Sequence, residues 1–230
     1  MLLACALLFG DPSHLPDSNG QGLRKKGEFG MAILSNHSRN ELSGLGLFFR
    51  EIFQSRRFMG AAAPSGPILG KAMASKVPSL QNGEVVVELG AGTGAITRQL
   101  INSGLKGDQL VSVERSPAMS THLRKTFPGL RVLEGDAGEL RELLKQHLGL
   151  SPDSVASIVS GLPLKSLPSS VVDAIVREVH ATLSPGGRFI QFTYDIRPRK
   201  NPVLAIFKRQ ETRVIWANFP PARVDVYERV

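Results

Sequence analysis

Residues 85–94 are Val-Val-Val-Glu-Leu-Gly-Ala-Gly-Thr-Gly, and this stretch decides the fold of the chain. Its three consecutive valines predict a strand that is buried on both faces, as in a parallel sheet. The glycines at every second position predict a tight turn, where the backbone can adopt positive φ and a ligand can approach without meeting a Cβ atom. A helix is expected from Ala95 onward. Strand, glycine turn and helix together predict a nucleotide-binding βα unit.

The glycine spacing is G-x-G-x-G, which differs from the G-x-G-x-x-G of dinucleotide sites. Glu88 also precedes the turn, where a pyrophosphate would be repelled but a ligand with an ammonium group would be attracted. This combination resembles the first motif of class I S-adenosylmethionine (SAM) methyltransferases. The alternative is a glycine turn selected only for strand–helix packing. The resemblance implies a SAM site that includes Glu88, Gly90, Ala91, Gly92 and Gly94.

Two further acids follow predicted strands. Residues 110–114 predict a second strand that ends in Glu114, where a carboxylate can accept hydrogen bonds from both ribose hydroxyls. Residues 130–134 predict a third strand, followed by Asp136. The resemblance implies that Asp136 accepts from the adenine amino group, although it could equally be the N-cap of a helix predicted over 138–148. The predicted cofactor site also includes the neighbours Arg115 and Ala137.

The fourth predicted strand, 155–160, leads into Ser-Gly-Leu-Pro-Leu at 160–164. In open α/β sheets this strand end faces the ligand crevice. Ser160 is therefore a candidate for both cofactor and acceptor, and Gly161 and Leu162 are candidates for orienting the acceptor nitrogen. Tyr194, at the end of a fifth predicted strand, could hydrogen-bond an amine or offer its ring face to a cation. A simply packed strand tyrosine is the alternative.

The net charge of +8 favours anionic partners, which are nucleic acid or an anionic membrane surface. The single cysteine, Cys5, excludes an internal disulfide and any cysteine-based zinc site, so we expect an intracellular protein without a metal. No window approaches the length of about 18 apolar residues that a transmembrane helix needs.

We expect residues 1–37 to be disordered, with Met31 as a candidate true start, and residues 38–80 to form an amphipathic and a capping helix before a catalytic domain at 81–230. Ser38 to Glu41 fits a capping box. The helix that follows has an aromatic face and arginine flanks, which suit a membrane interface, although packing on the protein's own core is the alternative. The predicted membrane contacts are Phe48, Phe49, Arg50, Phe53, Arg56 and Arg57.

Two other segments have weaker patterns. Ser65 lies in a small-residue link before a short helix predicted over 68–77, where it could contact the methionine end of SAM. Cations interleaved with apolar residues over 197–213 predict a second contact with an anionic surface, although a solvated face is the alternative. Residues 214–221 and 222–230 are expected to form a final pair of strands. The predicted surface contacts here are Arg197, Arg199 and Lys200.

Over residues 45–230 the chain resembles the bacterial phospholipid N-methyltransferases, on the motifs quoted above and on Trp-Ala-Asn-Phe-Pro-Pro-Ala at 216–222. This resemblance implies a Rossmann-like α/β fold with a seven-stranded, mostly parallel sheet in the order 3-2-1-4-5-7-6. It implies methylation of phosphatidylethanolamine toward phosphatidylcholine, with SAM converted to S-adenosylhomocysteine. It also implies a peripheral enzyme at the inner face of the cell membrane, with an amine phospholipid as substrate and no obligate protein partner.

Three alternatives stay open. Enzymes that methylate ornithine lipids look similar. An rRNA adenine N6-dimethyltransferase would also be basic, but such enzymes stack the extruded base on an aromatic residue, and here Pro163 is followed by Leu164. We therefore do not expect a nucleic-acid substrate. A non-catalytic scaffold is disfavoured because all three predicted cofactor acids are present.

Overall fold

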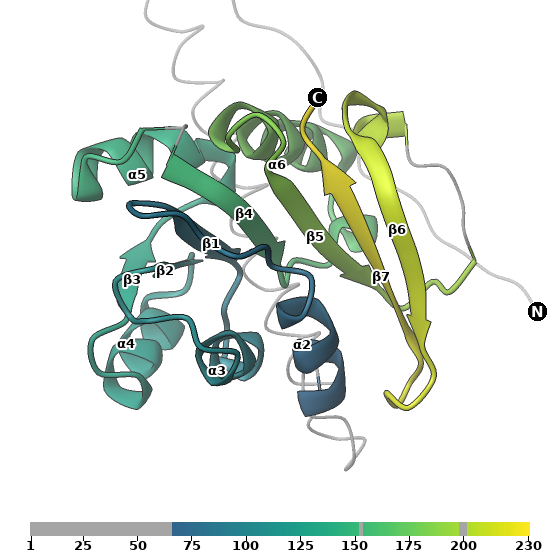
Figure 1. Cartoon of the computed structure of the whole chain (residues 1–230), viewed down its shortest axis with the longest axis horizontal. Helices are drawn as coiled ribbons and strands as arrows, with labels where there is room; N and C mark the ends of the chain where they lie inside the picture. Colours follow the sequence, from purple (N-terminus) through teal and green to yellow (C-terminus); the bar gives the residue numbers. More distant parts are fainter. Residues whose placement is uncertain (1–65, 152–153, 198–201) are drawn as a thin grey trace, which may run out of the picture. The chain divides into compact units, whose positions relative to one another are not determined.

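The structure is a computed structural model that describes residues 66–151, 154–197 and 202–230 (Figure 1). The expected disordered segment 1–37 and the expected amphipathic helix lie outside these residues. Among the described helices, none combines the length and the apolar character that crossing a bilayer requires.

A seven-stranded sheet forms the centre of the described structure, and its order β3-β2-β1-β4-β5-β7-β6 is the one predicted. Strands β1 to β5 pair in parallel, whereas β7 is antiparallel to both β5 and β6. The strands are β1 (Val85–Leu89), β2 (Leu110–Glu114), β3 (Arg131–Glu134), β4 (Val155–Ser160), β5 (Arg188–Thr193), β6 (Lys208–Ile215) and β7 (Ala222–Glu228).

Helices cover both faces of the sheet, which is why β1 and β4 are buried along their whole length. One face packs against α2, α3 and α4, and the other packs against α5 and α6, as Figure 1 shows. The helices are α2 (Pro67–Ala74), α3 (Ala95–Asn102), α4 (Pro117–Thr126), α5 (Leu140–Leu148) and α6 (Ser169–Thr182), with short 3-10 turns η1 (Ala137–Glu139), η3 (Leu164–Ser166) and η4 (Pro202–Ile206).

Two helix predictions need correction. The helix expected over 138–148 is divided into η1 and α5, because the Asp136 carboxylate caps a tighter turn by accepting from the Gly138 amide. The helix expected over 68–77 ends at Ala74. Beyond its end, Lys76 extends to the edge strand β6, where its ammonium lies 2.6 Å from a carboxylate oxygen of Glu211.

The strand expected over residues 214–221 was also predicted wrongly. Strand β6 occupies Lys208–Ile215, mostly within the segment 197–213 that was interpreted as a basic surface contact, and residues 216–221 form the turn before β7. An edge strand has only one paired side, so polar and charged residues at its exposed positions cost little, and the apolar alternation that predicts strands is lost.

Candidate functional site

The glycine turn lies between β1 and α3, with φ of 68° at Gly90, 54° at Gly92 and 80° at Gly94. An added Cβ atom on Gly90 would lie 2.5 Å from Leu162 Cδ2, and one on Gly94 would lie 2.3 Å from Phe127 Cε2. The turn therefore requires glycine for its backbone conformation and for its close packing. The packing alternative accounts for part of the motif, and the amides of the three glycines donate to acceptors within the protein.

Glu88 lies under this turn and is completely buried. Its Oε2 accepts hydrogen bonds from Thr97 Oγ1 at 2.7 Å and Ser112 Oγ at 2.8 Å, so it links β1 to α3 and β2. Its Oε1 has no hydrogen-bond partner among the described residues. Burial raises the pKa of the Glu88 carboxyl to about 7, against the lowering effect of the two hydroxyls. In this conformation Glu88 supports the turn from below, and its contact with a cofactor ammonium stays a prediction.

Glu114 ends β2 and lies directly beside the glycine turn. Its Oε2 accepts from the Gly92 amide and its Oε1 from the Ser116 amide, both at 2.8 Å. These two bonds fix the orientation of a partly buried carboxylate. Each carboxylate oxygen keeps a second acceptor position, so ribose hydroxyls can bind without displacing the amides. This geometry fits the predicted ribose contact.

Asp136 follows β3 at the same edge of the sheet. Its Oδ1 accepts from the Gly138 amide at 2.8 Å, which is the capping role left open from the sequence. Its Oδ2 lies 3.7 Å from Nε of Arg115, so these two predicted cofactor residues form an ion pair with each other. Ala137 begins η1 and is buried. The adenine contact of Asp136 is compatible with capping and stays a prediction.

The loop after β4 lies against the glycine turn, which brings the first and fourth motifs together. The Gly161 amide donates to the Leu89 carbonyl at 2.8 Å, and a Cβ atom on Gly161 would lie 2.8 Å from the Gly90 oxygen. The Leu162 amide donates to Ser160 Oγ at 3.3 Å. Ser160 is buried, so its hydroxyl shapes the loop and is not exposed to solvent in this conformation.

Gln191 of β5 holds the other side of this loop, and sequence reasoning missed it. Its Nε2 donates to the Leu162 carbonyl at 2.9 Å, while its Oε1 has no hydrogen-bond partner among the described residues. The predicted acceptor-orienting carbonyl of Leu162 is thus already bonded once. The ring of Tyr194 packs edge-on against Phe192, with centroids 5.5 Å apart, which matches the packed-tyrosine alternative.

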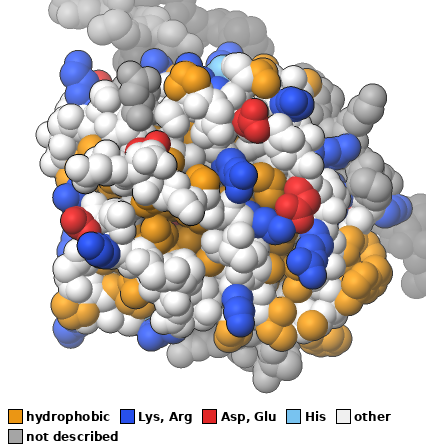
Figure 2. Space-filling view, viewed as in Figure 1, with side chains coloured by type: hydrophobic (Ala, Val, Ile, Leu, Met, Phe, Trp, Pro, Cys, Tyr) orange, Lys and Arg blue, Asp and Glu red, His pale blue; other side chains and the backbone are white. Residues whose placement is uncertain are grey.

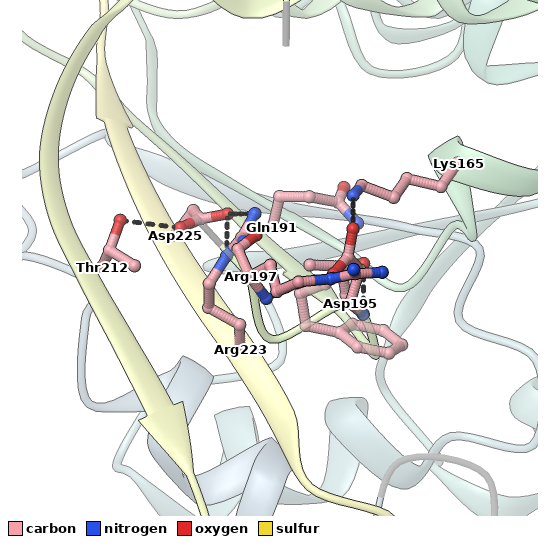
Figure 3. Close-up of polar contacts among 9 residues, drawn as sticks. Lys165, Gln191, Asp195, Arg197, Thr212, Arg223 and Asp225 are labelled. Carbon is pink, nitrogen blue, oxygen red and sulfur yellow. Dashed lines mark hydrogen bonds and ion pairs between the residues drawn. The ribbon is translucent and has the colours of Figure 1, made fainter. Parts of the chain in front are cut away.

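Charged side chains gather beyond the end of β5, as Figure 3 shows. Lys165 donates to Asp195, whose carboxylate also accepts from the Arg197 amide at 3.1 Å. The Lys165 ammonium and this amide lower the pKa of the Asp195 carboxyl to about 2. Asp195 is therefore ionised at neutral pH, just beyond the end of β5.

A buried ion pair lies beside this cluster. Arg223 Nε donates to Asp225 Oδ2 at 3.0 Å, and both side chains are only 4% exposed. Asp225 also accepts from Thr212 at 2.8 Å, and Arg223 donates to the Arg197 carbonyl (Figure 3). The sequence signal for this pair was an Arg-x-Asp step inside an otherwise apolar strand.

Most of the predicted membrane contacts lie outside the described residues. Arg197 is described, and its side chain is 72% exposed, 3.6 Å from Asp195. Ser65, the aromatic and arginine contacts predicted within 48–57, Arg199 and Lys200 lie outside the described residues. Within the described ranges, no group of three histidine, cysteine, aspartate or glutamate side chains could hold a metal ion.

The residues at this edge fit SAM. The positive-φ turn places glycine backbone beside Glu114, whose carboxylate keeps acceptor positions for ribose hydroxyls. Glu114 and the turn would hold the nucleoside, and Asp136 with Ala137 would contact the base. When bound, SAM supplies an electrophilic methyl group. The loop at 160–162 would then lie beside the reacting atoms, because it packs on Gly90.

Comparison with known proteins supports a SAM-dependent methyltransferase. A family model described as "Methyltransferase domain" matches residues 86–187. The chain is similar to an ornithine lipid N-methyltransferase of Singulisphaera acidiphila, with 34% identity over 150 residues, which cover 64% of this chain and 76% of the relative. It is also similar to a ribosomal RNA small subunit methyltransferase A of Chlorobium chlorochromatii, with 39% identity over 51 residues, which cover 22% of this chain and 18% of the relative.

A solved structure shows the same fold. It is a 1,6-didemethyltoxoflavin-N1-methyltransferase of Burkholderia thailandensis with bound S-adenosylhomocysteine, with a TM-score of 0.55 and 14% identity over 92% of this chain and 93% of that one. Sheet order, cofactor-edge geometry and these matches agree, and the chain belongs to the class I SAM-dependent methyltransferases.

Proposed function

We propose that the protein transfers methyl groups from SAM to the amine of a membrane-lipid headgroup. The observation that carries this proposal is the 34% identity to an ornithine lipid N-methyltransferase. The match covers 76% of the length of that relative. Phosphatidylethanolamine is the acceptor expected from the resemblance, and ornithine lipid is the acceptor named for the relative. Both lipids present an amine, so the proposal is made for this chemical class. The enzyme would work at the inner face of the cell membrane with an anionic lipid surface as its partner.

The loop after β4 supports a small amine acceptor over a nucleobase. Leu164, which occupies the place where base-methylating enzymes need an aromatic platform, is only 6% exposed and packs into the core. Leu162 packs on Gly90. An apolar loop at this place would help to exclude water where the methyl group is transferred.

The lipid amine must be neutral when its nitrogen forms the new bond to carbon as the carbon–sulfur bond breaks. Asp195 does not fit a proton acceptor, because its pKa is about 2. As a permanent anion after β5 it fits a second role, attraction of the headgroup while this is still an ammonium. Lys165 and Arg197 beside it supply cations for a lipid phosphate or carboxylate. Alignment and exclusion of water would then be the main contributions of the chain.

The rRNA alternative has one observation in its favour, the 39% identity over 51 residues to a ribosomal RNA methyltransferase. That match covers only 22% of this chain and 18% of the relative. An assay with rRNA therefore belongs beside the lipid assays.

The test is methyl transfer from labelled SAM by the full chain to three acceptors in parallel. Vesicles containing phosphatidylethanolamine, vesicles containing ornithine lipid, and deproteinised ribosomal RNA are compared, with Glu114→Ala as the inactive control. We expect label in the lipid extract for one or both amine lipids and none in RNA. Label in RNA alone, with both lipids unmodified, would overturn the proposal.

A further inference from the structure

The turn between β6 and β7, residues 216–221, exposes two large aromatic side chains. Trp216 is 69% exposed and Phe219 is 82% exposed, although the residues that flank the turn, Ile215 and Ala222, are buried. Ile68, at the start of the neighbouring helix α2, is a further exposed apolar side chain. A single exposed apolar residue is ordinary, but two exposed aromatics within one short hairpin turn indicate an interaction site.

The turn holds these aromatics outward by internal bonding. Asn218 is 5% exposed; its amide donates to the Ile215 carbonyl at 3.2 Å and its Nδ2 to the Pro220 carbonyl at 2.6 Å. Its Oδ1 lies 3.2 Å from where a Cβ atom on Gly66 would be, so the start of α2 packs directly on the turn. The polar Asn218 is buried and the two aromatics are exposed, whereas an ordinary surface turn exposes its polar residues.

The turn emerges at the edge of the sheet that carries the site. β7 pairs with β5 in the antiparallel sense, with Arg223 opposite Thr193, so the start of β7 lies at the end of β5. Ser160 and Gln191 are paired at the same strand ends. In Figure 1 the arrows of β4, β5 and β6 point toward this edge, and Figure 2 shows hydrophobic side chains at the lower right, over the end of the hairpin.

Charge decides which occupant suits the turn. The chain has a net charge of +8. Two exposed cations lie close in sequence to these apolar residues: Arg213 is three residues before Trp216, and Lys71 is one helical turn after Ile68. Aromatic tips beside cations are the combination that settles at the headgroup level of anionic bilayers. A convex tip also suits insertion between lipids better than it suits a groove for a peptide.

We propose that the β6–β7 turn is a membrane-insertion wedge, in which Trp216 and Phe219 enter an anionic lipid surface and bring the crevice edge against it. This inference rests on the proposed lipid substrate, and it assigns the contact to residues other than the N-terminal helix predicted from the sequence. Inserted this way, the turn would hold the ends of β4 and β5 at the level of the headgroups.

Trp216 is the single tryptophan of the chain, so intrinsic fluorescence reports on this turn alone. The full chain is titrated with phosphatidylglycerol vesicles and with phosphatidylcholine vesicles, with and without brominated acyl chains. We expect a blue shift and bromine quenching with phosphatidylglycerol, weakened by salt. An unchanged emission would overturn the inference. So would an emission that is already blue without lipid, because the turn would then be covered by protein.

Two matched variants separate the wedge from general hydrophobicity. Phe219→Ser removes an aromatic at the turn, and Val230→Ser removes a side chain that is 76% exposed beyond the opposite end of β7. Vesicle partitioning of Phe219→Ser should fall about tenfold and that of Val230→Ser should not change. Equal losses in both variants would contradict the wedge. SAM binding is measured for each variant to confirm that the protein is folded.

Lipid methylation in detergent micelles and in vesicles is measured on the same samples. Phe219→Ser should keep its micelle activity and lose vesicle activity. Vesicle lipid methylated without any Trp216 response would overturn the wedge and leave the proposed function standing. Trp216 insertion without methylation of either amine lipid would support the wedge and overturn the proposed function.

Discussion

Replacing Glu88 by glutamine tests the buried carboxyl below the glycine turn. The substitution keeps the shape of the side chain, and its amide can still bond the hydroxyls of Thr97 and Ser112, which act as donors or acceptors. The change therefore removes a titratable proton and little else. The free energy of unfolding of the two proteins should consequently differ in its pH dependence.

The direction and size follow from the pKa of the carboxyl. Burial raises that pKa from 4.5 to about 7. As the pH rises above 4.5 the unfolded chain loses this proton first, so the wild type becomes less stable until about pH 7 and then levels off. At about 1.4 kcal/mol for each pKa unit, the loss totals about 3 kcal/mol. Glutamine carries no such proton, so the variant should lack this contribution.

Urea denaturation from pH 4.5 to pH 8 without SAM measures the effect. The other titrating groups are shared, so the difference between the two free energies isolates residue 88. That difference should shift by about 3 kcal/mol in favour of the glutamine variant as the pH rises. Glu134→Gln, an exposed acid at the end of β3, should run parallel to the wild type. Parallel curves for Glu88→Gln would refute the reasoning, because they would mean that Glu88 ionises at its ordinary pKa.

Two further substitutions test the cofactor edge by isothermal calorimetry with SAM. Glu114→Ala should weaken binding about 100-fold, because hydrogen bonds to a charged acceptor contribute about 1.5–3 kcal/mol each. Glu134→Ala, opposite Glu114 on β3, should bind normally, and equal affinities in the two variants would contradict the ribose contact. Gly90→Ala should abolish binding and destabilise the fold, because its Cβ would lie 2.5 Å from Leu162. Gly83 also has a positive φ, but a Cβ atom there would meet nothing within 4 Å. A similar loss of stability in Gly83→Ala would therefore show that backbone strain alone is responsible.

Local sequence predicted the parallel half of the fold well, for a physical reason. Strands β1, β2 and β4 are buried on both faces, so they are short apolar runs, and glycine or proline marks their ends. Pro117 opens α4, because its missing amide hydrogen is not needed in the first turn. The placement of Gly90 and Glu114 follows from these elements alone. The cofactor edge was therefore visible in the sequence.

The antiparallel strands β6 and β7 and their contacts were harder to predict from the sequence, because these contacts join residues that are far apart in the chain. Strand β6 is mostly exposed, and its signal was hidden among lysines and arginines. Lys165 and Asp195 are separated by 30 residues, and Lys76 and Glu211 by 135. No periodicity or spacing rule connects such pairs. They become neighbours only when the sheet order places η3 beside the end of β5, and α2 beside β6.

The predictable and unpredictable parts of the site correspond to the methyl donor and the methyl acceptor of the proposed reaction. In the donor half, the glycine turn and Glu114 lie within 25 residues of one another, from Gly90 to Glu114, and only Asp136 and Ala137 come from further along the chain. The acceptor half needs Gln191 to hold the Leu162 carbonyl, and it needs Asp195 to be fixed by Lys165. Because long-range contacts build the acceptor half, a substitution there can change the acceptor while the donor half keeps its geometry. Acceptor specificity is therefore expected to vary among relatives that bind the same cofactor.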